Sequence, residues 1–494
     1  MSDAVIRGEG LTPSERRLAA LADRTFLRLW SYPNTFNDRT KGATGGGQEI
    51  ADLLAVFENH VVLFSDKEIG WQSDRPLALA WARWFRRAVE GGITQLNGAE
   101  RWIDQHPDRI FTDKLCTRQL PVPLPVKGNR VVHLVAVVSG AEAASRKYFR
   151  DPRGTLTILP ALKGPAHVNT ERADFRPFFV GDVNPKGSFI HVFDRTGLEI
   201  VMKELDTVAD FTAYLVARSK FLRSGQVGLV AGEEHLLAAY MMNGFKDGRP
   251  SFISEKLRKK ARRKLVIIPE GEFETYVSSG LHAEIDELKK QSMLWDDVIE
   301  KVTEDVLKGT SISILDQQPT LQLSEQALRV MASERRMDRV PLARALWGAM
   351  EYSLDEEMAR FVRRAFIPRR TPSRKIGYVF LILPQNPAAG TYEEYRVYRS
   401  RMLATYCLAV FREQPKLDTV VGLALDIFRR DGEIRTRSED VLAMAPPEWT
   451  PELLANFEND RVVFELKDPR ELEGVAMGHR IKNPFKVRAR QFKG

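Results

Sequence analysis

The sequence contains little cysteine and no long apolar run, and both shortages narrow the class of protein. Cys116 and Cys407 are the two cysteines in 494 residues, and each lies in apolar or helical surroundings. They provide neither a disulfide framework nor the spacing of a zinc site, so we expect two small buried hydrophobes in a reducing cytoplasm. No run approaches the ~18 apolar residues that a membrane span needs, so we expect no membrane partner.

Several sequence signals of targeting and catalysis are also missing. The N-terminus lacks a basic region followed by an apolar core, which is the pattern of a signal peptide. The sequence has no Gly-x-x-x-x-Gly-Lys-Ser/Thr loop, no His-Glu-x-x-His and no Gly-x-Ser-x-Gly elbow. The sequence therefore lacks the motifs typical of ATP-driven enzymes, zinc proteases and α/β-hydrolases.

The composition is that of an ordinary globular protein with sizeable cores. Hydrophobic residues make up 43% of the chain and charged residues 28%, and the length suffices for two to four domains. The net charge of +8 mildly favours a polyanionic partner such as nucleic acid.

The most informative stretch is a pair of apolar runs flanked by charged residues. Leu53 to Phe57 and Val61 to Phe64 are separated by a three-residue polar break, which predicts a β-hairpin with a buried face. Folding the hairpin brings the start of the first strand beside the end of the second. We therefore expect Asp52, Asp66 and Lys67 to converge at one end of the sheet, with Glu49 one turn away.

Carboxylates and an amine at a sheet edge suit the chemistry of phosphodiester cleavage. Asp52, Asp66 and Glu49 would offer hard oxygen ligands to Mg²⁺ or Mn²⁺. A metal ion in such a site polarises the phosphodiester and activates water. Lys67 would orient that water or offset charge on the pentacovalent phosphate. The alternative is a surface hairpin whose polar ends are solvated.

The arrangement resembles the PD-(D/E)XK nuclease superfamily over about residues 40 to 100. In the nuclease-related-domain branch, the strand aspartate and the motif lysine are spaced much as Asp52 and Lys67 are. The superfamily's acidic residue two positions before the lysine falls on Ser65, with Asp66 between. Some restriction endonucleases of this superfamily carry Ser-x-Lys and supply the carboxylate from elsewhere, for which Glu49, Asp66, Glu68 and Glu90 are candidates.

The surrounding pattern predicts a mixed α+β chain. Helices are expected at 12–31, with Thr12 as N-cap and Glu15 three residues on, and at 76–105, with a break or a bend at Gly91-Gly92. The second helix would present Arg86, Arg87, Glu90 and Gln95 near the metal. Strands follow at 131–138, 156–162, 178–180 and 188–193, where His133 and His191 are expected to be core residues and not catalytic bases.

Three domains are expected. Residues 1–245 would form a restriction-endonuclease-like mixed sheet with flanking helices, 246–370 a basic joint and a helical region, and 371–494 a small α/β module with a basic tail. In the last domain, strands at 378–383 and 420–425 flank a helix at 391–411, and residues 438–441 look like a helix start.

A dense basic run provides a second candidate for nucleic-acid binding. Seven cations within nine residues would grip a phosphate backbone or form a solvated helix end: Lys256, Arg258, Lys259, Lys260, Arg262, Arg263 and Lys264. The basic tail at 482–493 is a further candidate for docking on an anion or a partner.

Together these features predict a metal-dependent nuclease that hydrolyses phosphodiester bonds of DNA in preference to RNA. The resemblance implies a role in bacterial nucleic-acid processing or defence, with a homo-oligomer or protein partner left open. Two alternatives remain: a non-catalytic nucleic-acid-binding scaffold with a degenerate nuclease fold, favoured by Ser65, and a protein-interaction module in the C-terminal half.

Overall fold

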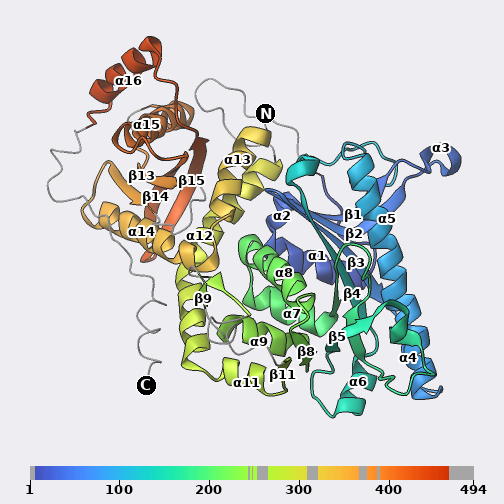
Figure 1. Cartoon of the computed structure of the whole chain (residues 1–494). Coiled ribbons are helices and arrows are strands. Elements are labelled where there is room, and N and C mark those ends of the chain that lie inside the picture. Colours follow the sequence, from blue (N-terminus) through green and yellow to red (C-terminus); the bar gives the residue numbers. More distant parts are fainter. Residues whose placement is uncertain are drawn as a thin grey trace. The chain divides into compact units, whose positions relative to one another are not determined.

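The protein divides into two compact units, described here from a computed structural model (Figure 1). One unit extends from Ile6 to Ile285 and the other from Asp286 onward. The structure describes residues 6–242, 245–246, 249–252, 265–308, 321–366, 375–386 and 390–466. Helices and mixed sheets occur in both units, and helices dominate the middle of the chain, so the predicted α+β class is confirmed. The domain limits at residues 245 and 370 stay predictions.

The first unit contains the predicted hairpin. Its helices are α1 (Pro13–Thr25), α2 (Leu27–Trp30), α3 (Lys41–Thr44), α4 (Leu77–Phe85), α5 (Gly91–Gln105), α6 (Glu142–Phe149), α7 (Arg195–Glu204), α8 (Val208–Leu222), α9 (Glu233–Met242) and α11 (Glu272–Val277), with helical turns η1 (Arg86–Glu90), η2 (Lys127–Asn129) and η3 (Gly164–Val168). Its strands are β1 (Ser31–Asn37), β2 (Gln48–Phe57), β3 (His60–Glu68), β4 (Val131–Ser139), β5 (Thr157–Lys163), β6 (Phe179–Asp182), β7 (Ile190–Asp194), β8 (Val227–Val230), β9 (Phe245–Lys246), β10 (Arg249–Pro250) and β11 (Val266–Ile268).

The central sheet has the strand order β1-β2-β3-β4-β7. The first three strands are antiparallel neighbours, whereas β3, β4 and β7 are parallel. A second sheet has the order β11-β8-β5-β6. The mixed sheet and its flanking helices agree with the fold predicted for this part of the chain.

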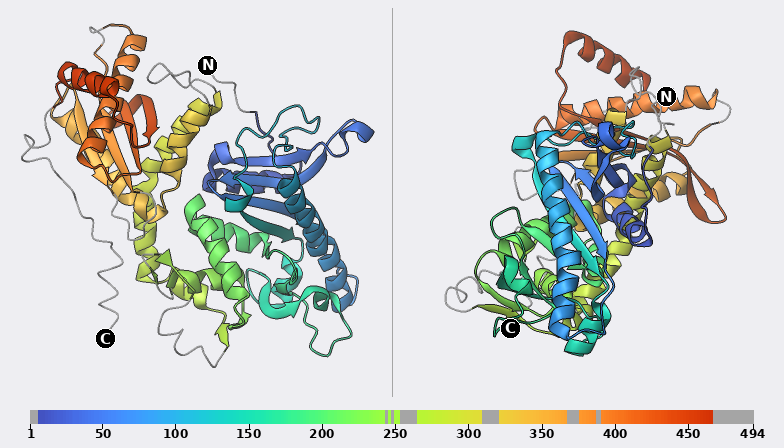
Figure 2. Two further views of the ribbon diagram at one scale, coloured as in Figure 1. Left: turned by 45° about the horizontal axis from the view of Figure 1, so that its top comes forward. Right: turned by 90° about the vertical axis from the view of Figure 1, so that its right-hand side faces the viewer.

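Helices α1 and α5 cover opposite faces of the central sheet. Phe64 packs edge-on against Phe26, which follows α1, with ring centroids 6.2 Å apart. The next residue, Ser65, faces Gly92 on α5. Because successive side chains of a strand point to opposite faces, the two helices lie on opposite sides of β3. Figure 2 shows α5 along its side of the sheet from two further directions.

The helix predicted at 76–105 forms, and the chain stays helical through Gly91-Gly92, where a break or a bend was expected. Helix α4 passes through the π-helical turn η1 directly into α5, which begins at Gly91. A Cβ at Gly92 would lie 3.4 Å from the Ser65 hydroxyl oxygen. The glycine therefore allows α5 to approach β3 closely, and this contact explains its presence in a helix.

The second unit contains one four-stranded sheet and its helices. The strands, in the order β12-β13-β14-β15, are β12 (Phe361–Phe366), β13 (Ile376–Ile382), β14 (Thr419–Arg430) and β15 (Glu433–Met444), and the helices are α12 (Gly280–Lys308), which contains the unit boundary, α13 (Leu321–Ala332), α14 (Arg336–Asp355), α15 (Tyr392–Glu413) and α16 (Pro451–Val463). Strands β13 and β14 are parallel and joined through α15, which confirms the predicted βαβ unit.

The predicted helix start at residues 438–441 is wrong, because these residues lie in β15. Asp440 pairs with Ala424 in the β-ladder and forms an ion pair with Arg399, whose side chain is fully buried. Of the two acidic residues that resemble a helix N-terminus, Asp440 is instead a partner of arginines on α15 and Glu439 a partner of Lys301 on α12. In the part of the chain that the structure describes, no helix is long and apolar enough to cross a bilayer.

Two buried carboxyl groups tie β5 to the helices α7 and α9. Asp194 accepts hydrogen bonds from the backbone N–H groups of Leu156 and Gly197, at 2.9 and 2.7 Å. Glu234 accepts one at 2.9 Å from the Thr155 hydroxyl, and its Oε2 atom is buried without a hydrogen bond. Burial raises the pKa of Asp194 to about 6, and burial together with the charge of Asp194 raises that of Glu234 to about 7.

We predict that Glu234→Gln flattens the dependence of stability on pH. In the unfolded chain Glu234 loses its proton near pH 4.5, whereas the folded chain retains it to about pH 7. The folded state of the parent protein therefore loses stability as pH rises through this window, on the scale of about 1.4 kcal/mol for each unit of pKa shift. Urea unfolding at several pH values measures the effect as a difference between parent and variant.

Glu199→Gln is the matched control, because Glu199 is exposed on α7. Its pH profile should follow the parent. Equal losses of stability in Glu234→Gln and the parent between about pH 5 and pH 7, a window above the reference pKa of about 4.3 for glutamate, would contradict the prediction. The buried carboxyl would then not be the cause of the pH dependence.

Candidate active site

The site lies where β2 and β3 separate. The two strands pair from Phe57 opposite His60 to Leu53 opposite Phe64, and the ladder ends there. Beyond this point β2 continues beside β1, and β3 continues beside β4 as far as Glu68. The sheet therefore opens between the two strands at the position of the predicted charged residues.

The carboxylate of Asp52 fills this opening. Its Oδ2 accepts hydrogen bonds from the backbone N–H of Asp66 at 2.5 Å and from Lys67 Nζ at 3.2 Å. Its Oδ1 accepts one from Gln95 Nε2 on α5 at 3.1 Å. Since a continued ladder would supply a backbone acceptor to such an N–H group, the carboxylate of Asp52 replaces the missing acceptor on β2.

Asp52 and Lys67 therefore converge as predicted. The Asp52 side chain is 3% exposed, whereas that of Lys67 is 30% exposed and reaches the carboxylate from the solvent side. An ion pair with one buried and one partly exposed member leaves N–H donors of the lysine available to a ligand.

The side chain of Asp66 points away from this pair, toward α1. Its Oδ2 accepts a short hydrogen bond from the Ser14 hydroxyl, and its Oδ1 is buried without a hydrogen bond in the part of the chain that the structure describes. Asp66 contacts Asp52 through its backbone, so the predicted convergence holds for its main chain and not for its carboxylate. Period-two alternation along β3 is the reason.

Ser65 occupies the position that the superfamily resemblance assigns to an acid. It is fully buried, and its hydroxyl donates to Gln95 Oε1 at 2.8 Å. Gln95 in turn donates to Asp52, so the three side chains form a hydrogen-bonded row beneath α5. Ser65 thereby fixes the orientation of the Asp52 carboxylate. Of the polar residues predicted on this helix, Gln95 reaches the site.

Glu49 joins the site through a residue that the sequence did not indicate. The side-chain amide of Asn34 on β1 donates to Glu49 Oε1 and to Glu15 Oε2, each at 2.8 Å. Glu15 belongs to the predicted capping box of α1, which the structure confirms. The capping pattern places Glu15 at the start of a helix, but nothing in the local sequence shows that this helix end meets β2.

Burial, with a smaller contribution from repulsion among the carboxylates, raises two of their pKa values. Burial, followed by the charges of Asp52 and Glu15, raises the pKa of Glu49, although the Asn34 hydrogen bond opposes the shift. Burial also raises the pKa of Asp66, against the Ser14 hydrogen bond and Arg195, and Asp52 and Glu15 add to the rise. Burial raises the pKa of Glu15 as well, but its hydrogen bonds outweigh this and the net shift is downward.

The four carboxylates are therefore close enough to interact, yet they do not form a ready cage. Among the described residues, no group of three or more His, Cys, Asp and Glu side chains is arranged to hold a metal ion. The buried, unpartnered Oδ1 of Asp66 is nevertheless an oxygen that a cation would satisfy. By chemistry, the carboxylates of Asp52, Glu49 and Asp66 are hard oxygen donors of the kind that a divalent cation prefers, although that of Asp66 turns toward α1 and away from Asp52.

Other polar candidates lie elsewhere. His133 is buried and within 2.9 Å of His60, and burial lowers its pKa to about 3. His191 is buried beside Arg218, and burial and that charge lower its pKa. Among the described residues, neither histidine forms a hydrogen bond with Asp52 or Lys67. The basic run at 256–264 and the tail at 482–493 fall outside the described residues.

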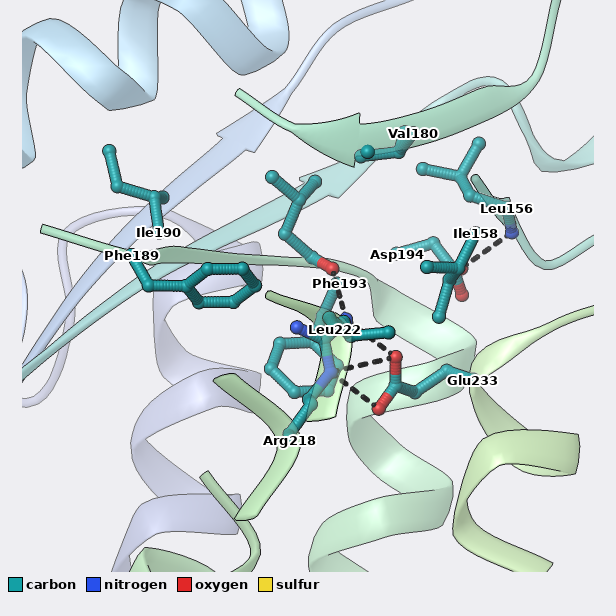
Figure 3. A pocket seen from close by; sticks show the side chains of 12 residues that line it. Leu156, Ile158, Val180, Phe189, Ile190, Phe193, Asp194, Arg218, Leu222 and Glu233 are labelled. Atoms are coloured by element: carbon teal, nitrogen blue, oxygen red, sulfur yellow. Dashed lines mark hydrogen bonds and ion pairs between the residues drawn. The ribbon is translucent and has the colours of Figure 1, made fainter. Parts of the chain in front are cut away.

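A buried ion pair lines a separate small cavity (Figure 3). Arg218 donates to both carboxylate oxygens of Glu233, from Nε at 2.9 Å and from Nη2 at 2.7 Å, and Tyr214 adds a hydrogen bond at 2.6 Å. The cavity of about 20 Å³ admits a water molecule and no larger ligand. This cluster is structural, because its charged groups are committed to one another.

Comparisons with known proteins identify no relative. The chain matches no family model, no curated protein and no solved structure. Inference about function therefore rests on the residues and their geometry.

We predict that Asp52→Asn destabilises the first unit. The Asn amide offers one acceptor oxygen, which at the place of Oδ2 keeps the bonds from the Asp66 N–H and Lys67, and its NH₂ group then faces the Gln95 Nε2 amide as a donor opposite a donor. Leaving such a buried group unpaired costs about 1–3 kcal/mol. Urea unfolding should show this loss, whereas Asp74→Asn, at an exposed position before α4, should match the parent. Equal stability of the two variants would mean that the Gln95 amide turns over and accepts from the Asn NH₂ group through its Oε1.

Proposed function

We propose that the protein is a metal-dependent nuclease whose active site is the opening between β2 and β3. The observation that carries the proposal is the Lys67–Asp52 pair, with Nζ and Oδ2 3.2 Å apart. The Asp66 carboxylate, which turns toward α1, has one buried oxygen without a hydrogen bond among the described residues. Nucleic acid is the proposed substrate, with DNA preferred to RNA, and bacterial defence in the cytoplasm is the proposed setting.

The charges at the opening support binding of a divalent cation. Glu15, Glu49, Asp52 and Asp66 interact with one another, and Lys67 is the one cation in direct contact with any of them among the described residues. Mg²⁺ and Mn²⁺ prefer carboxylate oxygens, and a cation would relieve the repulsion that contributes to the raised pKa values of Glu49 and Asp66. A bound ion would polarise the phosphodiester and activate water for attack.

Side chains of the protein would stabilise the transition state and position the reacting groups. Lys67 would place its free N–H donors against the non-bridging oxygens of the phosphate, where negative charge develops. The row Ser65–Gln95–Asp52 would hold Asp52 in one orientation, so that little reorganisation accompanies the reaction. Asn34 would keep Glu49 and Glu15 beside the same opening.

A non-catalytic nucleic-acid-binding scaffold is the second candidate. Two observations favour it: Ser65 replaces the acid of the motif, and no three-residue metal group is arranged among the described residues. In this case Lys67 and Asp52 would be a structural ion pair closing the gap in the sheet. A protein-interaction role for the second unit remains compatible with either candidate.

The direct experiment is a cleavage assay with the purified full chain. Plasmid, single-stranded DNA and RNA are incubated with Mg²⁺, with Mn²⁺ or with chelator. We expect cleavage with metal, none with chelator, and a loss of about 10²–10³-fold in rate for Lys67→Ala, the size typical for removing a group that stabilises the transition state. Asp52→Ala should lose at least as much.

The controls separate a catalytic effect from misfolding. Lys220→Ala alters an exposed lysine of α8 and should keep full activity. Thermal melting and circular dichroism establish that Lys67→Ala remains folded. Metal-dependent cleavage that survives Lys67→Ala would contradict the proposed site, and salt-sensitive binding without cleavage by the parent protein would favour the scaffold.

A further inference from the structure

Arg195 lies at the same edge of the sheet as the candidate active site. The parallel strands β3, β4 and β7 end at Glu68, Ser139 and Asp194, and the register places Glu68 beside Ser139 and Val138 beside Asp194. Arg195 follows β7 as the first residue of α7. Ligands of open α/β sheets bind outside the carboxyl ends of parallel strands, so Arg195 occupies a position suited to ligand contact.

The guanidinium of Arg195 is anchored through a single nitrogen. Nη2 donates to the hydroxyl oxygens of Ser14 at 2.6 Å and Ser139 at 2.8 Å, and to Glu68 Oε2 at 3.2 Å. Nε and Nη1 make no hydrogen bond within the described residues. The side chain is 20% exposed, so these donors are available at a partly open surface.

Ser14 connects Arg195 to the candidate active site. Its hydroxyl has one proton, which it donates to Asp66 Oδ2, so it meets Arg195 with an acceptor lone pair. Arg195 also opposes the rise in the pKa of Asp66. The guanidinium is therefore held at a fixed place relative to Asp66, and hence to the opening beside Lys67.

Arg195 differs from the structural arginine of the same unit. Arg218 is 3% exposed and binds both oxygens of Glu233 together with the Val192 carbonyl. The carboxylate partner of Arg195, Glu68, is 58% exposed and is contacted through one oxygen. Ion pairs of this exposed kind contribute little to stability, so a ligand can displace one partner at small cost.

We propose that Arg195 binds a backbone phosphate of the nucleic acid next to the phosphodiester at the active site, and that Glu68 competes with this phosphate. The inference rests on the proposed function and assigns to it a substrate contact. A guanidinium matches phosphate because its planar N–H groups donate to two oxygens at once. In the free protein Glu68 occupies part of this donor set, and a phosphate displaces it.

Binding experiments in chelator separate this contact from catalysis. Fluorescence anisotropy measures the affinity of the full chain for a labelled single strand and a labelled duplex between about 50 and 200 mM KCl, the range in which phosphate contacts are salt-sensitive. Arg195→Ala should weaken binding and reduce the slope of log K against log salt by about 0.7 for the single strand and about 0.9 for the duplex, the loss of one phosphate contact.

Two variants distinguish phosphate binding from a structural role. Glu68→Gln should strengthen binding, because it frees Arg195 from its competitor, and this gain should vanish when Arg195→Ala is also present, whereas a gain from the lost negative charge alone would remain in the double variant. Arg195→Lys should recover most of the salt slope. Arg101→Ala, at an exposed position on α5, is the control and should bind like the parent.

The outcomes separate this inference from the proposed function. An unchanged salt slope in Arg195→Ala, or no gain in affinity for Glu68→Gln, overturns the phosphate site even if the parent protein cleaves DNA. An Arg195-dependent slope without metal-dependent cleavage supports the phosphate site and overturns the nuclease. Absence of any nucleic-acid binding by the parent overturns both. Thermal melting of Arg195→Ala establishes that the variant is folded.

Discussion

The hydrogen bond between the Asp66 N–H and the Asp52 carboxylate is the contact on which the arrangement around it depends. The β2–β3 ladder stops at Leu53 and Phe64, and a β-strand that leaves its partner exposes backbone groups that need acceptors. Asp52 provides one from the side chain, and its second oxygen reaches α5. The same carboxylate also holds Lys67 at 3.2 Å. Closure of the sheet and placement of the candidate catalytic amine are therefore one interaction.

The several hydrogen bonds to the Asp52 carboxylate have an electrostatic consequence. Hydrogen bonds from the backbone, Gln95 and Lys67 stabilise the Asp52 charge, whereas Glu49 and Asp66 are left with raised pKa values. The site therefore combines a carboxylate whose two oxygens are both hydrogen-bonded with two carboxylates whose pKa values are raised, chiefly by burial. Such an imbalance is typical of functional sites, where charge is arranged for a ligand and not for the free protein.

The sequence predicted the hairpin, the mixed sheet and the Asp52–Lys67 pair because these follow from local patterns: apolar runs, a short polar break and the antiparallel return of a strand. It did not predict Glu15, Asn34 or Arg195, which reach the site from α1, β1 and α7 through tertiary packing. The direction of the Asp66 side chain was predictable, since alternation along β3 puts residues 65 and 66 on opposite faces. The strand at residues 438–441 was missed because acidic residues that pair with cations of α12 and α15 look like a helix start.

The serine at position 65 has a physical explanation that does not require loss of function. Its neighbours are Gly92 and Gln95 of α5, and it is fully buried. A carboxylate there would meet the Gln95 Oε1 oxygen and lie away from solvent, where an uncompensated charge is costly. Asp66, one residue later, instead faces α1, Ser14 and the carboxyl edge that carries Arg195. If the site binds a cation, close packing of α5 on β3 explains why its acid lies on the other face of the strand.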